Sequence, residues 1–108
     1  MTWNKLKEVL PDWKCYRGNC PEGTFPFEII QTAWGKKKGI HVFAEIESGE
    51  KFWFFIPLFR SKRDRWNIYQ IFRDDIEPPA AVNMSIDKTP SGISTISKIE
   101  SRNGAAQR

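Results

Sequence analysis

The fold is decided by residues 24–73, which read TFPFEIIQTAWGKKKGIHVFAEIESGEKFWFFIPLFRSKRDRWNIYQIFR. Four segments in this stretch, 25–34, 40–47, 51–58 and 66–72, are rich in aromatic and β-branched residues. Three short polar breaks separate them. Aromatic and β-branched residues favour strands, and short polar breaks favour tight connections between strands. The pattern therefore predicts an antiparallel meander of four strands.

The break at Ser48-Gly49 predicts a two-residue hairpin turn, in which the glycine supplies a positive φ. This turn places Ile46 opposite Lys51 and divides the side chains of the central hairpin between two faces. The first face carries Ile40, Val42, Ala44, Ile46, Trp53 and Phe55, and the second carries His41, Phe43, Glu45, Phe52, Phe54 and Ile56.

Both predicted faces are largely apolar, although an antiparallel sheet commonly exposes one face to water. Three arrangements would explain this. The sheet curls into a small barrel, which we favour; the C-terminal segment crosses the second face; or the second face is a binding platform.

A short helix is predicted at residues 2–10. Thr2 can cap its N-terminus, Trp3, Leu6 and Leu10 share one stripe, and Pro11 ends it. A helix of two to three turns needs a docking surface to be stable. We therefore expect one domain at residues 1–76, made of this helix and the meander.

After residue 76 the composition changes to one rich in Ser, Thr, Gly and Asn. Residues 77–108 are predicted to form an extended C-terminal arm or tail, in which residues 93–99 form either a strand or part of the arm. Ile93, Ile96 and Ile99 are its regularly spaced apolar anchors, expected to contact the sheet or a partner. The expected fold class is α+β, mainly β: a small antiparallel meander or partly closed barrel with a short N-terminal helix and this arm.

Charge gives the strongest functional indication. The formal net charge is +4, which favours acidic partners such as nucleic acid or an acidic protein surface. In a meander the two basic breaks, GKKKG and RSKRDR, fall at the same end of the sheet. The candidate nucleic-acid-binding residues are the cations Lys36, Lys37, Lys38, Arg60, Lys62, Arg63 and Arg65 and the flanking rings Trp34, Phe59 and Trp66.

Catalytic and metal chemistry is poorly represented. The only histidine is His41, and the carboxylates of Asp74, Asp75 and Glu77 have no matching second cluster. Gly35–Gly39 lacks the pattern of a phosphate-binding loop. We expect no enzyme activity, no cofactor and no metal.

The two cysteines, Cys15 and Cys20, can be a reduced pair or a disulfide, and the absence of an export signal favours the reduced pair. No apolar run approaches the ~20 residues that span a bilayer. We expect a cytoplasmic location.

Two functions remain. The first is a non-enzymatic nucleic-acid-binding module, favouring single strands, because cations beside rings suit a phosphate backbone with stacked bases. The second is a small accessory, adaptor or inhibitor subunit of a larger assembly, docked through its apolar sheet face and C-terminal arm.

Overall fold

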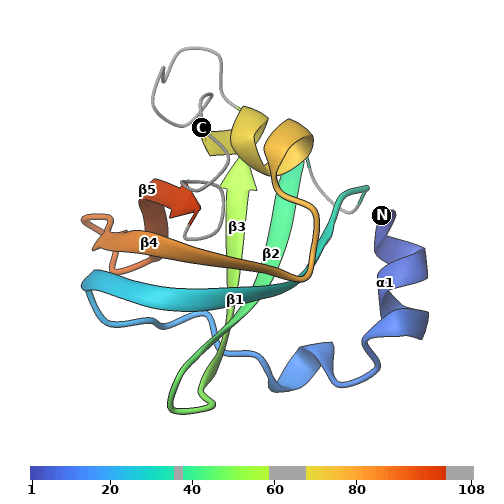
Figure 1. Ribbon diagram of the computed structural model, residues 1–108, viewed down its shortest axis with the longest axis horizontal. Helices are drawn as coiled ribbons and strands as arrows, with labels where there is room; N and C mark the ends of the chain where they lie inside the picture. The colour runs from blue at the N-terminus through green and yellow to red at the C-terminus, as the bar shows by residue number, and fades with distance from the viewer. Residues whose placement is uncertain (36–37, 59–67, 102–108) are drawn as a thin grey trace.

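The computed structural model describes residues 1–35, 38–58 and 68–101. Its elements in chain order are α1 (Trp3–Val9), η1 (Trp13–Cys15), β1 (Gly23–Ala33), β2 (Gly39–Ile46), β3 (Lys51–Pro57), η2 (Ile71–Asp75), β4 (Ala80–Lys88) and β5 (Ser94–Ser101). The five strands form one antiparallel sheet in the order β3-β2-β1-β4-β5 (Figure 1). The expected fold class, α+β and mainly β, is confirmed. Closure into a barrel is not seen, because β3 and β5 do not pair within the described residues.

The fourth strand expected at 66–72 is wrong over its described part. Residues 68–70 form a helical turn that continues into the π-helix η2. Ile68 and Phe72, four residues apart, share one side of this helical segment and are both buried in the core. A short apolar run suits a buried helix as well as a strand, and here the helical alternative is the one adopted.

The segment expected as a C-terminal arm supplies the last two strands of the sheet. β4 pairs with β1 from Gly23 opposite Ile86 to Ile29 opposite Ala80, and β5 pairs with β4. Alternate residues of β4 are buried, namely Val82, Met84 and Ile86. Residues 80–101 thus belong to the sheet or to the connection between its last two strands, and 102–108 lie outside the described residues.

The turn between β2 and β3 is one residue longer than expected. Gly49 N donates to Ile46 O at 2.9 Å, and Ile46 N donates to Glu50 O at 3.0 Å, so three residues form the loop. Gly49 has φ 92°, as in a turn closed by a glycine bulge. Adding one residue to the loop slips the register by one, which moves every side chain of β3 to the other face.

The expected face assignment of β3 is therefore wrong. Phe52, Phe54 and Ile56 lie opposite Ala44, Val42 and Ile40, and all six are in the main hydrophobic core. Trp53 and Phe55 lie opposite Phe43 and His41 on the outer face.

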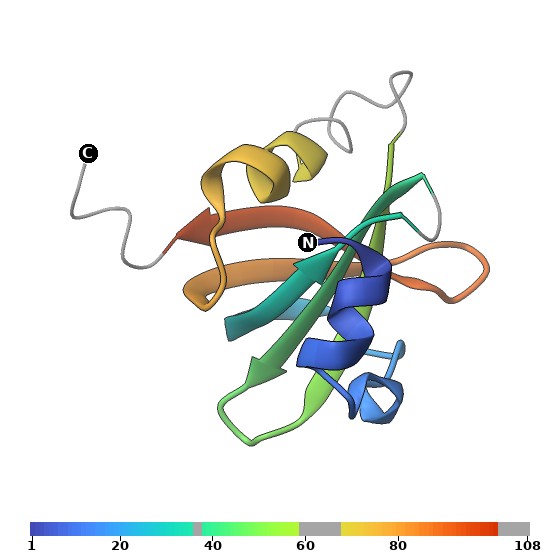
Figure 2. The same cartoon turned by 90° about the vertical axis from the view of Figure 1, so that its right-hand side faces the viewer.

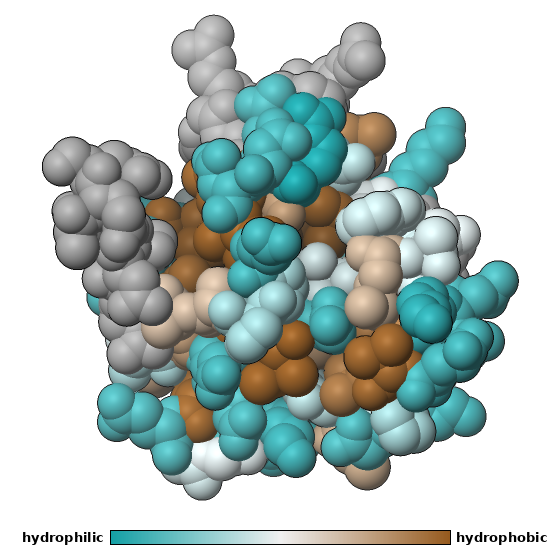
Figure 3. Space-filling model, turned by 45° about the vertical axis from the view of Figure 1, so that its right-hand side comes forward, coloured by the Kyte–Doolittle hydropathy of each residue, from teal (hydrophilic) through white to brown (hydrophobic). Residues whose placement is uncertain are grey.

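The outer face of β2 and β3 is covered by α1 and the residues that follow it (Figure 2). Thr2 caps α1, as expected, by accepting a hydrogen bond from Lys5 N at 3.3 Å. The buried Trp3 stacks on Trp53 with 5.8 Å between ring centroids, and Leu6 is fully buried. On this side of the molecule hydrophilic side chains divide the apolar surface into separate patches (Figure 3).

His41 is buried under this helix at 2% exposure, consistent with a packing role. Its Nδ1 accepts a hydrogen bond from Trp53 Nε1 at 3.1 Å. That bond requires an unprotonated Nδ1, so a neutral imidazole fits the site.

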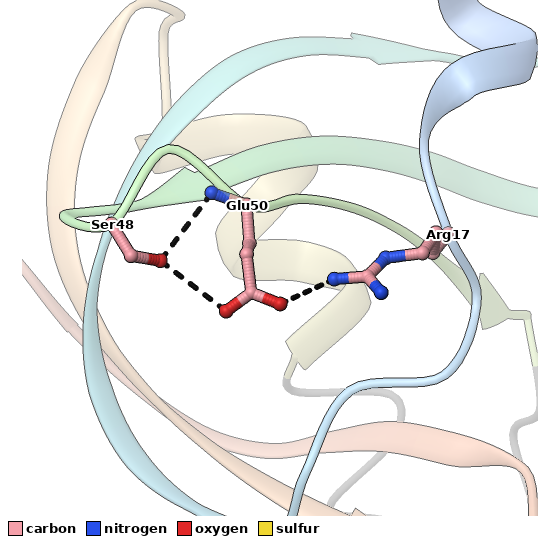
Figure 4. A network of polar contacts seen from close by, with 3 residues as sticks. All are labelled: Arg17, Ser48 and Glu50. Atoms are coloured by element: carbon pink, nitrogen blue, oxygen red, sulfur yellow. Dashed lines mark hydrogen bonds and ion pairs between the residues drawn. The ribbon is translucent and has the colours of Figure 1, made fainter.

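The segment after η1 covers the first part of the free edge of β3. Arg17 N donates to Lys51 O at 3.0 Å, and Trp53 N donates to Arg17 O at 2.8 Å. The Arg17 guanidinium also bonds the carboxylate of Glu50, which Ser48 Oγ contacts at 3.3 Å (Figure 4). This network ties the β2–β3 loop to the N-terminal segment.

The register can be tested by comparing two neighbouring phenylalanines. Phe54→Ala removes a ring that is 2% exposed and should cost about 3–5 kcal/mol of unfolding free energy. Phe55→Ala removes a half-buried ring and should cost clearly less. Urea titration of both variants measures the difference, and a larger loss for Phe55 would contradict the observed register.

Candidate nucleic-acid interface

The β1–β2 connection and the end of β3 lie side by side at one end of the sheet, which we call the basic end (Figure 2). The β4–β5 connection follows the stretch where Ile86 pairs with Gly23 at the start of β1, and it approaches the end of β3 through Thr89. Gly39 lies opposite Pro57, and Leu58 N donates to Lys38 O at 3.3 Å. The chain therefore enters its second basic segment directly beside the first one.

Of the residues predicted to bind nucleic acid, Trp34 and Lys38 are described. Both are exposed, Trp34 at 47%. The backbone of Trp34 is held by the N-terminus, because Trp34 N donates to Met1 O and Trp3 N donates to Trp34 O. The other predicted residues lie outside the described part of the chain: Lys36, Lys37, Phe59, Arg60, Lys62, Arg63, Arg65 and Trp66.

The second basic segment joins two described residues of the basic end in the sequence. The segment 59–67 begins after Leu58 and ends before Ile68, and each of its cations is at most five residues from Pro57 or Ile68.

An apolar pocket of about 110 Å³ opens between the edges of β3 and β5. It is lined by Phe55, Ile56, Pro57, Ile68, Thr89, Thr95 and Ile96. Pro57 and Ile68, the anchors of the basic segment, are both part of its wall. The strands that fail to close the sheet thus leave a small cavity at the basic end.

Phe55 is the residue of this site that sequence reasoning missed. The centroid of its ring lies 4.8 Å from the centroid of the His41 ring. Phe55 also lines the pocket. The signal that could have placed it there is Gly49, because a three-residue loop moves Phe55 out of the core.

The absence of a side chain at Gly39 leaves room for the Phe55 ring. A Cβ at position 39 would lie 2.3 Å from Ile56 O and 2.7 Å from the Phe55 ring, and the φ of Gly39 is 147°. Only glycine allows the β2 backbone to pass so close to β3 here.

The isoleucines predicted to bind a partner are placed differently from one another. Ile96 is 7% exposed in the core, Ile99 packs against that core, and Ile93 is 62% exposed in the β4–β5 connection. Of the three, Ile93 offers its side chain to solvent.

Carboxylates gather away from the basic end. Glu28 lies opposite Glu45 in the sheet, and both line a surface hollow together with Glu47. Like charges directly opposite each other repel, so this pair is unfavourable for stability. The described part of the chain therefore keeps these acids apart from Lys38 and Trp34.

Both cysteines are free thiols. Cys15 is exposed, whereas Cys20 is buried, and its backbone exchanges two hydrogen bonds of 2.9 Å with Ser94 Oγ. Burial, and to a lesser degree the charge of Glu50, raises the pKa of the Cys20 thiol to about 11. Among residues 1–35, 38–58 and 68–101, no three His, Cys, Asp or Glu side chains are grouped to hold a metal ion.

Comparison with known proteins found no matching family model, no similar curated protein and no similar solved structure. No helix within the described residues has the length and apolar character needed to cross a membrane.

The close approach at Gly39 predicts a large effect of a single methyl group. Gly49→Ala, with φ 92° and nothing near its Cβ, should cost about 1–2 kcal/mol through backbone strain. Gly39→Ala should cost about 2 kcal/mol more, because the Ile56 carbonyl cannot move without loss of strand pairing. Thermal or urea unfolding measures both variants, and equal losses would argue against this close approach.

The cysteines should differ in reactivity. Thiolate is the reacting species, so the exposed Cys15 should be alkylated by iodoacetamide in the native protein at pH 8. Cys20, buried and with a raised pKa, should react only after unfolding. Mass spectrometry of peptides counts the modified sites, and fast native labelling of Cys20 would contradict its position.

Proposed function

We propose that this protein is a non-enzymatic nucleic-acid-binding module that favours single strands. The observation that carries the proposal is the basic end itself. An apolar pocket and the half-buried ring of Phe55 lie where both basic segments of the chain join the sheet. Rings and cations in one place are what a single strand requires, since its bases are free to stack and its phosphates need neutralising.

The cations supply the affinity that does not depend on sequence. Lys38 is described and exposed. In the sequence, Lys36 and Lys37 directly precede it, and the segment between Leu58 and Ile68 contains Arg60, Lys62, Arg63 and Arg65. Each phosphate that they neutralise releases a counterion, so binding should weaken steeply with salt. The distant carboxylates of Glu28, Glu45 and Glu47 disfavour binding of the same strand at the other end.

The topology gives independent support by analogy. The strand order β3-β2-β1-β4-β5, with a helical segment between β3 and β4, resembles that of OB-folds opened between β3 and β5. OB-folds are five-stranded, partly open barrels that bind oligonucleotides or oligosaccharides at their β1–β2 and β4–β5 loops. In this chain the β1–β2 connection carries Lys38, and the β4–β5 connection contributes Thr89 to the pocket. A shared topology alone does not imply a shared ligand, so the charge decides in favour of nucleic acid.

The alternative, an accessory or inhibitor subunit, has less support in the structure. It rests on an uncovered apolar sheet face and a free arm. The outer face is covered by α1, and residues 80–101 form β4, β5 and the connection between them.

The proposal is tested by charge removal at the two ends. Replacing Lys36, Lys37 and Lys38 by Gln should weaken binding of a fluorescent oligo-dT and flatten its salt dependence. The slope of log K against log salt should change by about 0.7 for each phosphate that is no longer neutralised. Fluorescence anisotropy at several salt concentrations measures both quantities.

The matched control is the double variant Glu45→Gln, Glu47→Gln at the other end of the sheet. It should leave the slope unchanged and strengthen binding slightly through net charge. Equal changes from the two variants would indicate diffuse attraction without a site, and no binding of the wild type at low salt would refute the function.

A further inference from the structure

We propose that the pocket between β3 and β5 accepts one unstacked base of the bound strand, preferably a pyrimidine. This inference rests on the proposed function and assigns a particular contact to it. The pocket belongs to the basic end, yet none of the residues singled out in the sequence for nucleic-acid binding is among those that line it.

The walls of the pocket suit the face of a flat ring. Ile56, Pro57, Ile68 and Ile96 supply aliphatic surface, and the Phe55 ring adds an aromatic one. A planar base presents π-faces to such walls whatever its identity.

The size of the pocket favours a single ring. Its volume is about 110 Å³, whereas an engineered apolar cavity of roughly 150 Å³ holds benzene. One ring therefore fills the space and extends into the open mouth, and the second ring of a purine would remain outside.

Two threonines, Thr89 and Thr95, are the residues with a polar side chain in the pocket lining. Thr89 Oγ1 is fixed by the β4–β5 connection, since it accepts from Ile93 N at 3.1 Å and bonds Ser91 Oγ at 2.9 Å. Thr95 lies on β5 and lines the same pocket. A hydroxyl both donates and accepts, so these groups can bond the edge of a base without choosing between thymine and cytosine.

Charge decides the occupant. A ring from a protein partner would also fit apolar walls. However, the chain carries a formal net charge of +4, and the exposed Lys38 lies beside the pocket wall, because its carbonyl accepts a hydrogen bond from Leu58 N, next to Pro57. A ring attached to an anionic backbone matches this charge, and a base in a nucleic-acid strand is such a ring.

The first experiment blocks the pocket with a larger side chain at a residue that lines it. Thr95→Phe places an aromatic ring in the space, and Thr24→Phe makes the same change at an exposed position of β1 outside the pocket. Thr95→Phe should weaken oligo-dT binding about tenfold, within the range measured for loss of one stacked base, and leave the salt slope unchanged. Thr24→Phe should bind like the wild type. Circular dichroism and urea unfolding check that both variants are folded.

A second measurement on the wild type does not depend on any variant. Oligo-dT strands with one abasic site are scanned position by position, and one position should weaken the affinity about tenfold, as expected when one stacked base is removed. A single dA at that position should also weaken binding, by a smaller factor. The Thr95→Phe variant should be insensitive to the abasic site there.

The outcomes separate this inference from the function on which it rests. If the wild type binds oligo-dT but tolerates an abasic site at every position, or if Thr95→Phe binds as tightly as Thr24→Phe, the pocket does not hold a base. If the wild type binds no single strand at low salt, the proposed function fails and the base pocket with it. A preference for dT over dA that survives in Thr95→Phe would mean that strand stacking, and not the pocket, selects pyrimidines.

Discussion

The three-residue loop between β2 and β3 determines which rings this protein buries and which it presents. Gly49 allows the extra loop residue by adopting a positive φ, and the register of β3 follows from it. Phe52 and Phe54 then enter the core, while Trp53 and Phe55 face outward. Trp3 of α1 then packs on Trp53, and Phe55 lines the pocket. Both the helix-covered face and the candidate interface depend on this slip of one residue.

Much of the fold is predictable from local patterns. The Thr2 cap and the stripe of Trp3 and Leu6 locate the helix, and aromatic and β-branched runs locate the first three strands. The errors arise where local patterns are degenerate. Ile68 and Phe72 suit either a strand or a helix. The Ser- and Thr-rich residues after 76 form β4, which pairs with β1, and β5, which pairs with β4, because tertiary context overrides their weak apolar content.

The candidate site is less predictable than the fold. Clustering of the two basic breaks requires only the order of strands in a meander, and the bond between Lys38 and Leu58 agrees with it. The pocket cannot be predicted, because it joins Pro57 and Ile68 to Thr89 and Thr95, and the local sequence does not indicate that β3 and β5 come near each other. A two-residue turn at Ser48-Gly49 would put Phe55 in the core, so its place in the wall follows only from the longer loop. Sites made by strands that meet across a gap have no signal in the local sequence.

The partly covered edge of β3 has a consequence for solubility. Residues 52–56 read FWFFI, an uncharged aromatic run of the kind that assembles into intermolecular β-sheets when its edge is free. The backbone of Arg17 occupies the edge at Lys51 and Trp53, and Pro57 has no N–H to offer further along. The loop between η1 and β1 therefore blocks part of the β3 edge from pairing with another chain. Proteolytic cleavage or local unfolding at Arg17 would leave the most aggregation-prone strand of the protein open to a second copy.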